Sequence, residues 1–157
     1  MIKNISLNNL VLTIREVKFY DVFAVMNYLK IRWDVYISEY KRNIFKEFDF
    51  LDFKAKHHIF IVAGKVVGVA KVLYKQDSAK ISRVAVSKSY RGKGFGGKLI
   101  KELVAEIQNH REIKTINLVA AEKSLVSFYS KFGFEDNGQV YFDNIPYTSM
   151  IKHLEKI

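Results

Sequence analysis

The alternation of hydrophobic and polar positions divides the chain into short segments that predict both strands and helices. β-Branched and aliphatic residues concentrate over residues 10–17, which predicts a first strand. A helical spacing of apolar residues follows over roughly 22–38, directly after Asp21, a residue type that caps helix N-termini. The apolar positions of this predicted helix are Val22, Val25, Met26, Leu29, Trp33 and Ile37.

The middle of the chain predicts a loop and then strands joined by short turns. Residues 40–53 are irregular and acidic, which suits a loop or a short helix. Residues 57–63 and 66–73 are apolar segments separated by a glycine turn, and they predict a hairpin. The segment 80–87 predicts one more strand.

The last third of the chain predicts helices alternating with strands. Apolar spacing over 99–109 predicts an amphipathic helix, and 114–120 predicts a buried strand. A short helix is expected between Ser124, as its cap, and Gly133, whose left-handed conformation would end it. One or two final strands are expected from Phe134, 140–142 and 148–151. This order predicts an α/β chain that forms a single domain over residues 1–157.

Composition narrows the possible functions. The chain has 157 residues, a formal net charge of +10 and no cysteine, which rules out disulfides, thiolate metal sites and a cysteine nucleophile. No apolar run approaches the ~20 residues that span a bilayer, and no signal peptide precedes the first strand, so we expect a cytoplasmic protein without membrane contact. The positive charge suits anionic ligands, but the lysines are spread along the chain, so nucleic acid is not indicated.

A glycine-rich stretch between the predicted strand 80–87 and the helix 99–109 carries the strongest chemical signal. Four of the eight glycines lie within six residues, 92–97. A strand, a glycine loop and a helix N-terminus together form an anion site, because unpaired backbone N–H groups and the helix dipole face the loop. The cations Arg91, Lys93 and Lys98 add formal charge.

Two common phosphate loops do not fit this stretch. The spacing Gly92-x-Gly94-x-x-Gly97 matches a dinucleotide fingerprint, but too few βα units follow and the strand 114–120 ends without the required acid. A Walker A loop is excluded because the ending GK[ST] is missing. The loop therefore predicts a different phosphate-bearing ligand.

Three segments resemble the GCN5-related N-acetyltransferases, the GNAT superfamily. Residues 91–96, RGKGFG, match the R/Q-x-x-G-x-G/A motif of that superfamily. Residues 83–86, RVAV, resemble its fourth strand, and residues 128–134, FYSKFGF, resemble its FY-x-x-x-GF segment at the usual separation. The resemblance extends over nearly the whole chain.

The chain is most similar to the ElaA-like, or YjcF-like, subgroup of small bacterial acetyltransferases. The subgroup element E-x-D-x-x-D-x-x-A-x-H corresponds to Glu47, Asp49, Asp52, Ala55 and His57. Residues 144–150, NIPYTSM, resemble its Gly-Ile-Pro-His-x-x-Met tail, with Tyr147 in place of His. Two further departures are Glu122, where the subgroup often has Gln and the superfamily Asn, and residues 38–40, where Val-x-E-Q is usual.

The resemblance implies an α/β (α+β) GNAT fold. This fold has a mixed central sheet with antiparallel N-terminal hairpins, a βαβα C-terminal half and helices on both faces. It also implies acetyl-CoA as co-substrate, with the pyrophosphate on the glycine loop and the pantetheine arm paired with the preceding strand like an extra β-strand. The coenzyme-binding residues would be Val84, Ala85, Val86, Arg91, Gly92, Lys93, Gly94, Phe95, Gly96, Gly97 and Lys98.

The implied reaction is direct transfer of an acetyl group to a primary amine of a small molecule or a peptide. Tyr129 matches the general acid of the superfamily, and a phenol with a pKa near ~10 suits protonation of a thiolate. Five residues compete as the general base, Glu122, Glu47, Asp49, Asp52 and His57. We take Glu122 and Asp49 as the catalytic candidates, and expect acceptor-binding roles for Glu47, Asp52, His57 and Tyr147. No metal site is expected, because His57 and its neighbour would point to opposite faces of a strand.

Several alternatives stay open at the level of sequence. Tyr129 could be a core residue, Tyr147 could simply pack beside the proline, and the acidic loop could be solvated or select a cationic substrate. A non-catalytic module of the same fold, binding CoA or nucleic acid, is the alternative to an enzyme. The basic surface would favour an anionic amine such as an amino sugar phosphate, whereas the acidic loop would favour a polyamine or lysine. A homodimer is compatible with the sequence.

Overall fold

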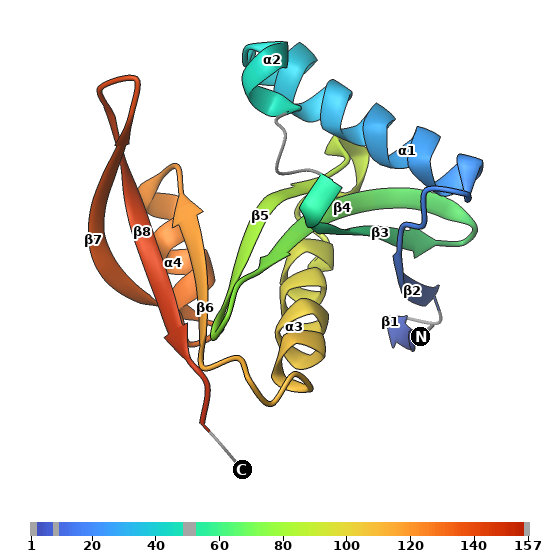
Figure 1. Cartoon of the computed structure of the whole chain (residues 1–157). Coiled ribbons are helices and arrows are strands. Elements are labelled where there is room, and N and C mark those ends of the chain that lie inside the picture. Colours follow the sequence, from blue (N-terminus) through green and yellow to red (C-terminus); the bar gives the residue numbers. More distant parts are fainter. Residues whose placement is uncertain (1–2, 8–9, 49–52, 156–157) are drawn as a thin grey trace. The chain divides into compact units, whose positions relative to one another are not determined.

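The computed structural model describes residues 3–7, 10–48 and 53–155, which form the elements drawn in Figure 1. The chain forms two compact units. Unit 1 comprises Met1–Leu73 with Arg83–Leu99, and unit 2 comprises Tyr74–Ser82 with Ile100–Ile157. Each unit is described by itself, and the expectation of a single domain stays a prediction. Within the described residues, no helix is both long and apolar enough to cross a membrane.

Unit 1 combines an antiparallel set of strands with a helical segment. Its strands are β1 (Lys3–Leu7), β2 (Leu10–Glu16), β3 (Lys56–Val62), β4 (Lys65–Tyr74) and the second part of β5 (Ser78–Val86), in that order across the sheet. The helical part comprises α1 (Val22–Arg32), the π-helical turn η1 (Trp33–Glu39) and α2 (Ile44–Glu47). Consecutive strands from β1 to β4 pair antiparallel, which confirms the predicted hairpin.

The core of unit 1 lies between α1, η1 and the strands. Ala24, Tyr28 and Ile31 of α1 pack in one cluster with residues of β3, β4 and β5, including Ile59 and Val69. Figure 1 shows α1 running along β3 and β4. Val35 and Tyr36 of η1 and Ala85 of β5 belong to the same cluster, which places η1 beside the second part of β5.

The predicted start of α1 is confirmed, but the apolar stripe of the prediction is largely exposed. The Asp21 carboxylate accepts a hydrogen bond from the Ala24 amide at 2.9 Å, as expected of an N-cap. The exposed members of the stripe are Val22, Met26, Leu29 and Trp33. The helix carries apolar residues on both faces, so spacing alone does not identify the buried face. Its core face includes Tyr28 and the fully buried Arg32, which is a charged residue.

Unit 2 is built around the first part of β5 and the strands β6 (Thr115–Ala120), β8 (Ile145–His153) and β7 (Glu135–Phe142), in that order. β5 pairs parallel with β6 at Ser78–Lys80, and β8 pairs antiparallel with both β6 and β7. The helices are α3 (Phe95–Gln108), of which unit 2 holds the part from Ile100 onward, and α4 (Lys123–Ser130). Parallel and antiparallel pairs together confirm a mixed sheet.

Four details of the strands and helix ends differ from or refine the predictions. Strand β1 was not predicted. Ser124 does not cap α4, because the N-cap position belongs to Glu122, and the Ser124 hydroxyl instead donates to the Glu122 carboxylate at 3.3 Å. Gly133 has φ +79°, which confirms the predicted left-handed residue after α4. The last segment forms two strands joined at Asp143 and Asn144, both with positive φ as a tight hairpin turn requires.

Candidate active site

The glycine loop leaves β5 through the 3₁₀ turn η3 (Lys88–Tyr90) and ends where α3 begins at Phe95. Gly92 and Gly94 have φ of +72° and +79°, and an added Cβ would meet nothing within 4 Å at either. Backbone conformation rather than crowding therefore requires glycine at both positions. The Lys98 amide donates to the Gly94 carbonyl at 3.2 Å as the helix starts. The preceding amides of the first turn are those that a helix leaves unpaired, which suits an anion.

Arg91 ties this loop to η1. Its guanidinium donates to both carboxylate oxygens of Glu39, at 2.5 and 2.9 Å, and its Nε donates to the Val86 carbonyl at 2.9 Å. The hydrogen bonds from Arg91 lower the pKa of Glu39, and those to Glu39 raise the pKa of Arg91. Arg91 was expected to add free charge for a phosphate. In the structure Glu39 balances that charge, and Arg91 also fixes the start of the loop.

The backbone of Val84–Val86 presents alternate carbonyls to opposite sides of β5. The Val84 carbonyl accepts from the Tyr36 hydroxyl at 2.9 Å and the Val86 carbonyl accepts from Arg91. The Ala85 carbonyl faces β4, where it would lie 3.0 Å from a Cβ added at Gly68. The structure therefore brings the predicted coenzyme strand and the glycine loop together in unit 1, both held by side chains of η1.

A buried ion cluster lies beside this strand, at the end of α2. Glu47 is 1% exposed, and its Oε1 lies 2.9 Å from Arg32 Nη2 and 2.8 Å from Arg83 Nε. The Arg32 contact is a hydrogen bond, whereas the Arg83 Nε–H is not aimed closely enough at the oxygen to make one. Arg32 also stacks over the Phe48 ring at 4.6 Å. Glu47 was expected to bind the acceptor, but its Oε1 is committed to two guanidinium groups.

The other predicted residues of the acidic segment have different surroundings. His57 is buried in β3, and its Nδ1 lies 2.8 Å from the Tyr28 hydroxyl. His58 is buried as well. Asp49 and Asp52 lie outside the described residues. Within the described ranges no group of three or more His, Asp or Glu side chains is arranged to hold a metal ion.

Tyr129, Glu122 and Tyr147 all belong to unit 2. Tyr129 is 7% exposed on α4, with the Phe128 and Phe134 rings 5.1 and 6.0 Å away. Burial raises the pKa of its phenol to about 12, so the hydroxyl stays protonated throughout the physiological range. Glu122 is exposed at the start of α4. Tyr147 is half-buried on β8, with its ring 5.4 Å from Phe142.

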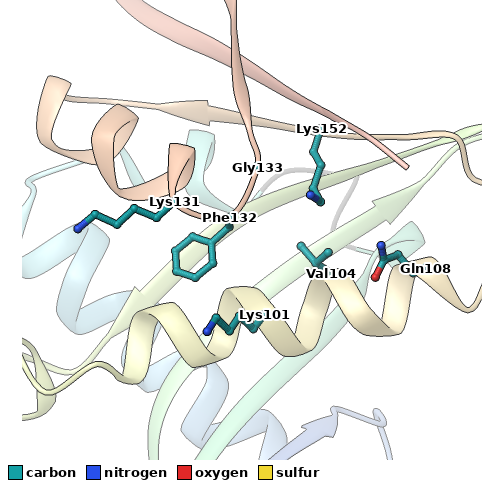
Figure 2. A pocket seen from close by; sticks show the side chains of 7 residues that line it. All are labelled: Lys101, Val104, Gln108, Lys131, Phe132, Gly133 and Lys152. Carbon is teal, nitrogen blue, oxygen red and sulfur yellow. The ribbon is translucent and has the colours of Figure 1, made fainter. Parts of the chain in front are cut away.

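Unit 2 also contains a basic pocket of about 350 Å³, shown in Figure 2. α3 contributes Lys101, Val104 and Gln108, and the turn after α4 contributes Lys131, Phe132 and Gly133. The remaining lining residue, Lys152 of β8, extends toward α3, and its Nζ would lie 2.6 Å from a Cβ added at Gly133. Glycine at position 133 thus leaves room for this ammonium group.

The comparison with known families is decisive. The profile of the acetyltransferase (GNAT) domain matches residues 34–154. The chain belongs to the GNAT family. This membership confirms the expected enzyme class, an acyltransferase. The matched range of this GNAT chain includes Glu47 and Arg83 of the ion cluster, the glycine loop, α4 and all of η1 except Trp33.

Relatives and solved structures agree with this family. The uncharacterized N-acetyltransferase YjcF of Bacillus subtilis is 27% identical over 124 residues, which cover 78% of this chain and 87% of that protein. ElaA of Escherichia coli has the same fold, with a TM-score of 0.77 and 23% identity over 97% of this chain and 99% of its own. A GNAT acetyltransferase of Elizabethkingia anophelis, solved with acetyl-CoA bound, has a TM-score of 0.65 at 13% identity, covering 91% and 98%. The fold expected from the sequence is confirmed.

Sequence reasoning missed the residues that support the predicted coenzyme strand of this GNAT chain. Arg32, Tyr36 and Arg83 were not singled out for any role, and Glu39 was noted only as a departure from the subgroup pattern. A signal was present for two of them. Arg32 lies between the apolar residues Ile31 and Trp33, and Arg83 directly precedes the apolar run 84–86. A charge that becomes buried in such a position is retained only when a partner is buried with it.

Proposed function

We propose that this protein is an N-acetyltransferase that transfers an acetyl group from acetyl-CoA directly to a primary amine. The observation that carries the proposal is the joint placement of the glycine loop and the Val84–Val86 backbone in unit 1. The pyrophosphate of the coenzyme would accept hydrogen bonds from the amides of residues 92–97. The pantetheine arm would pair with β5, as the resemblance to GNAT enzymes implies. Phe95 and Lys98 complete the loop end of this site.

The chemical step follows from the functional groups available. The neutral amine attacks the thioester carbonyl carbon, and a backbone N–H of β5 stabilises the negative charge on the carbonyl oxygen. The C–S bond then breaks and the thiolate leaves as CoA. The chain has no cysteine, so an acyl-cysteine intermediate is impossible, which supports direct attack.

Two proton transfers complete the reaction. Tyr129 donates a proton to the leaving sulfur; its buried phenol, with a pKa of about 12, is protonated before the step, although the same shift makes it a weaker acid than an ordinary phenol. The amine loses its proton to a carboxylate, for which Glu122 and Asp49 are our candidates. His57 and Tyr147 remain proposed contacts of the acceptor, together with Asp52. Glu47 is better suited to a supporting role, because its Oε1 lies against two guanidinium groups.

The proposed acceptor is a primary amine of a small molecule or a peptide, as the resemblance to GNAT enzymes implies. Wild-type protein should be stabilised against heat by acetyl-CoA and should release free CoA thiol with a suitable amine. A panel should contain polyamines, lysine peptides and amino sugar phosphates, because these separate cationic from anionic acceptors. Binding of nucleic acid without acetyl-CoA binding would instead identify a non-catalytic module.

The glycine loop is tested with a matched pair of substitutions. Gly94→Ala and Gly138→Ala both place a side chain at positive φ, +79° and +88°, with nothing within 4 Å of the new Cβ. Both should be strained to a similar degree. Only Gly94→Ala should weaken acetyl-CoA binding, by about tenfold or more, in a calorimetric titration. Equal affinities for the two variants would remove the loop from the coenzyme site.

Tyr129 is tested by turnover rather than binding. Tyr129→Phe should lower kcat by about 10²-fold, the scale typical of a lost general acid, while acetyl-CoA affinity changes little. The exposed Tyr141→Phe is the control for loss of a tyrosine hydroxyl in unit 2. An unchanged kcat in Tyr129→Phe would show that the phenol only packs.

A further inference from the structure

Arg83 adopts a backbone conformation that is unusual for its residue type. Its φ is +53°, in the left-handed region, although it lies inside β5. Residues other than glycine rarely occupy this region, and they remain there only when their surroundings hold them. A left-handed residue in a strand turns the following peptide groups and locally bends the strand. The residues that follow are Val84–Val86, the proposed partner of the pantetheine arm.

Contacts from two helical elements hold this bend. At the end of α2, Glu47 Oε1 lies 2.8 Å from Arg83 Nε, and the Lys46 carbonyl accepts from Arg83 Nη2 at 3.4 Å. From η1, the Tyr36 ring lies under the Arg83 guanidinium at 5.8 Å, and its hydroxyl donates to the Val84 carbonyl at 2.9 Å. The side chain of residue 83 and the backbone of residue 84 are therefore fixed separately.

Glu47 is itself held rigidly. It is 1% exposed, and Arg32, equally buried, donates from Nη2 to Oε1 at 2.9 Å and also to the Glu47 backbone carbonyl. Stacking of Arg32 over Phe48 adds a further constraint. A buried carboxylate with two guanidinium partners cannot shift without leaving charge uncompensated. Such a group can transmit the position of α2 to β5.

We propose that Glu47 is a positioning residue for acetyl transfer. It holds Arg83 in the left-handed conformation and thereby sets the direction of the backbone N–H groups at Val84–Val86. This inference rests on the proposed function, in which such an N–H stabilises the developing oxyanion. Stabilisation of that kind depends on aim, because the donor must reach the position the oxyanion will occupy. Loss of the clamp should therefore lower kcat, while coenzyme affinity, supplied mainly by residues 92–97, should change little.

The test uses the difference between alanine and glycine at position 83. Both Arg83→Ala and Arg83→Gly remove the ion pair, but only glycine adopts positive φ without a steric penalty. We expect Arg83→Ala to lower kcat at least tenfold and Arg83→Gly to stay within about threefold of wild type. The Kd for acetyl-CoA should stay within about threefold in both.

A second set of variants, made in protein that carries Glu47→Gln, extends the test to Glu47. Glu47→Gln should lower kcat at least tenfold, and adding Arg83→Gly should restore most of that loss, because glycine no longer needs the clamp. A merely structural role predicts that the two Arg83 variants differ in thermal stability, with alanine at positive φ the less stable, but have the same kcat per folded molecule. Thermal unfolding of every variant accompanies the kinetics. Should Glu47→Gln fail to fold, the Arg83→Ala and Arg83→Gly pair decides alone.

Equal kcat values for Arg83→Ala and Arg83→Gly would overturn the inference, whether both are active or both inactive. Failure of the proposed function would look different. Wild-type protein would then bind no acetyl-CoA, or would release no CoA with any amine of the panel. The wild-type measurement therefore separates the two failures.

Discussion

Unit 1 contains two arginine–carboxylate contacts that join the helical segment to the proposed coenzyme site, and the two contacts differ in burial. The cluster of Glu47 with Arg32 and Arg83 is inaccessible at its carboxylate, with 1% exposure. The pair Arg91–Glu39 is 35% exposed on both sides. A buried pair cannot be broken without leaving a charge in a poorly solvated place, whereas water replaces the partners of an exposed pair. The first contact is therefore suited to fixing geometry, and the second to exchanging partners when a phosphate arrives.

The largest expected effect concerns stability. Glu47→Gln leaves two buried or half-buried guanidinium groups without their counter-charge, and it should lower the free energy of unfolding by about 3–5 kcal/mol. Glu39→Gln breaks the exposed pair and should cost less than about 1 kcal/mol. Urea unfolding of both variants at pH 7 measures the two values. Similar losses would contradict the distinction between the contacts.

The next effect concerns coenzyme binding at the exposed pair. Arg91→Gln leaves the Glu39 carboxylate uncompensated beside an anion site, so the Kd for acetyl-CoA should rise about tenfold. If Arg91 acts by neutralising Glu39, the double variant Arg91→Gln with Glu39→Gln should regain most of the affinity. If Arg91 also contacts the pyrophosphate, the double variant should stay weak. Calorimetric titration of the single and double variants gives the coupling between the two residues.

A smaller effect should appear on acidification. Arg91 lowers the pKa of Glu39 from its ordinary value of 4.5, so the folded state releases this proton more readily than the unfolded state. The stabilisation by the pair is therefore complete above pH 4.5 and is lost as the pH falls through the lowered pKa. The difference in unfolding free energy between wild type and Glu39→Gln should be present at pH 7 and shrink below pH 4.5. A difference that grows on acidification would show that Arg91 does not stabilise the ionised carboxylate.

The smallest expected effect is the response of the two stability losses to salt. One molar salt reduces the Debye length to about 3 Å and screens exposed charges more than buried ones. The stability cost of Glu39→Gln should therefore nearly vanish in 1 M NaCl, while that of Glu47→Gln should persist. A salt-sensitive Glu47 variant would indicate that water reaches the cluster.

Much of the fold could be predicted because its signals are local. The Asp21 cap, the left-handed Gly133 and the glycine loop each act through residues close in sequence. The ion cluster could not be predicted in this way, because Arg32, Glu47 and Arg83 are brought together only by packing. The buried face of α1 could not be predicted from the spacing of apolar residues either, since such residues lie on both sides of that helix, Met26 on the exposed side and Ile31 on the buried side. Spacing reports that a helix is amphipathic only when one of its faces is polar.

Gly68 on β4 lets the backbone of β4 approach the proposed coenzyme strand closely. A Cβ at this position would lie 3.0 Å from the Ala85 carbonyl oxygen and 3.4 Å from the Phe60 Cβ, so the neighbouring strand would have to move by tenths of an ångström to admit it. A residue remote from any reacting atom thus sets how closely β4 approaches the segment of β5 that would align the thioester. Selection at position 68 would then act on the spacing of two backbones, and a single methyl group would be enough to change that spacing.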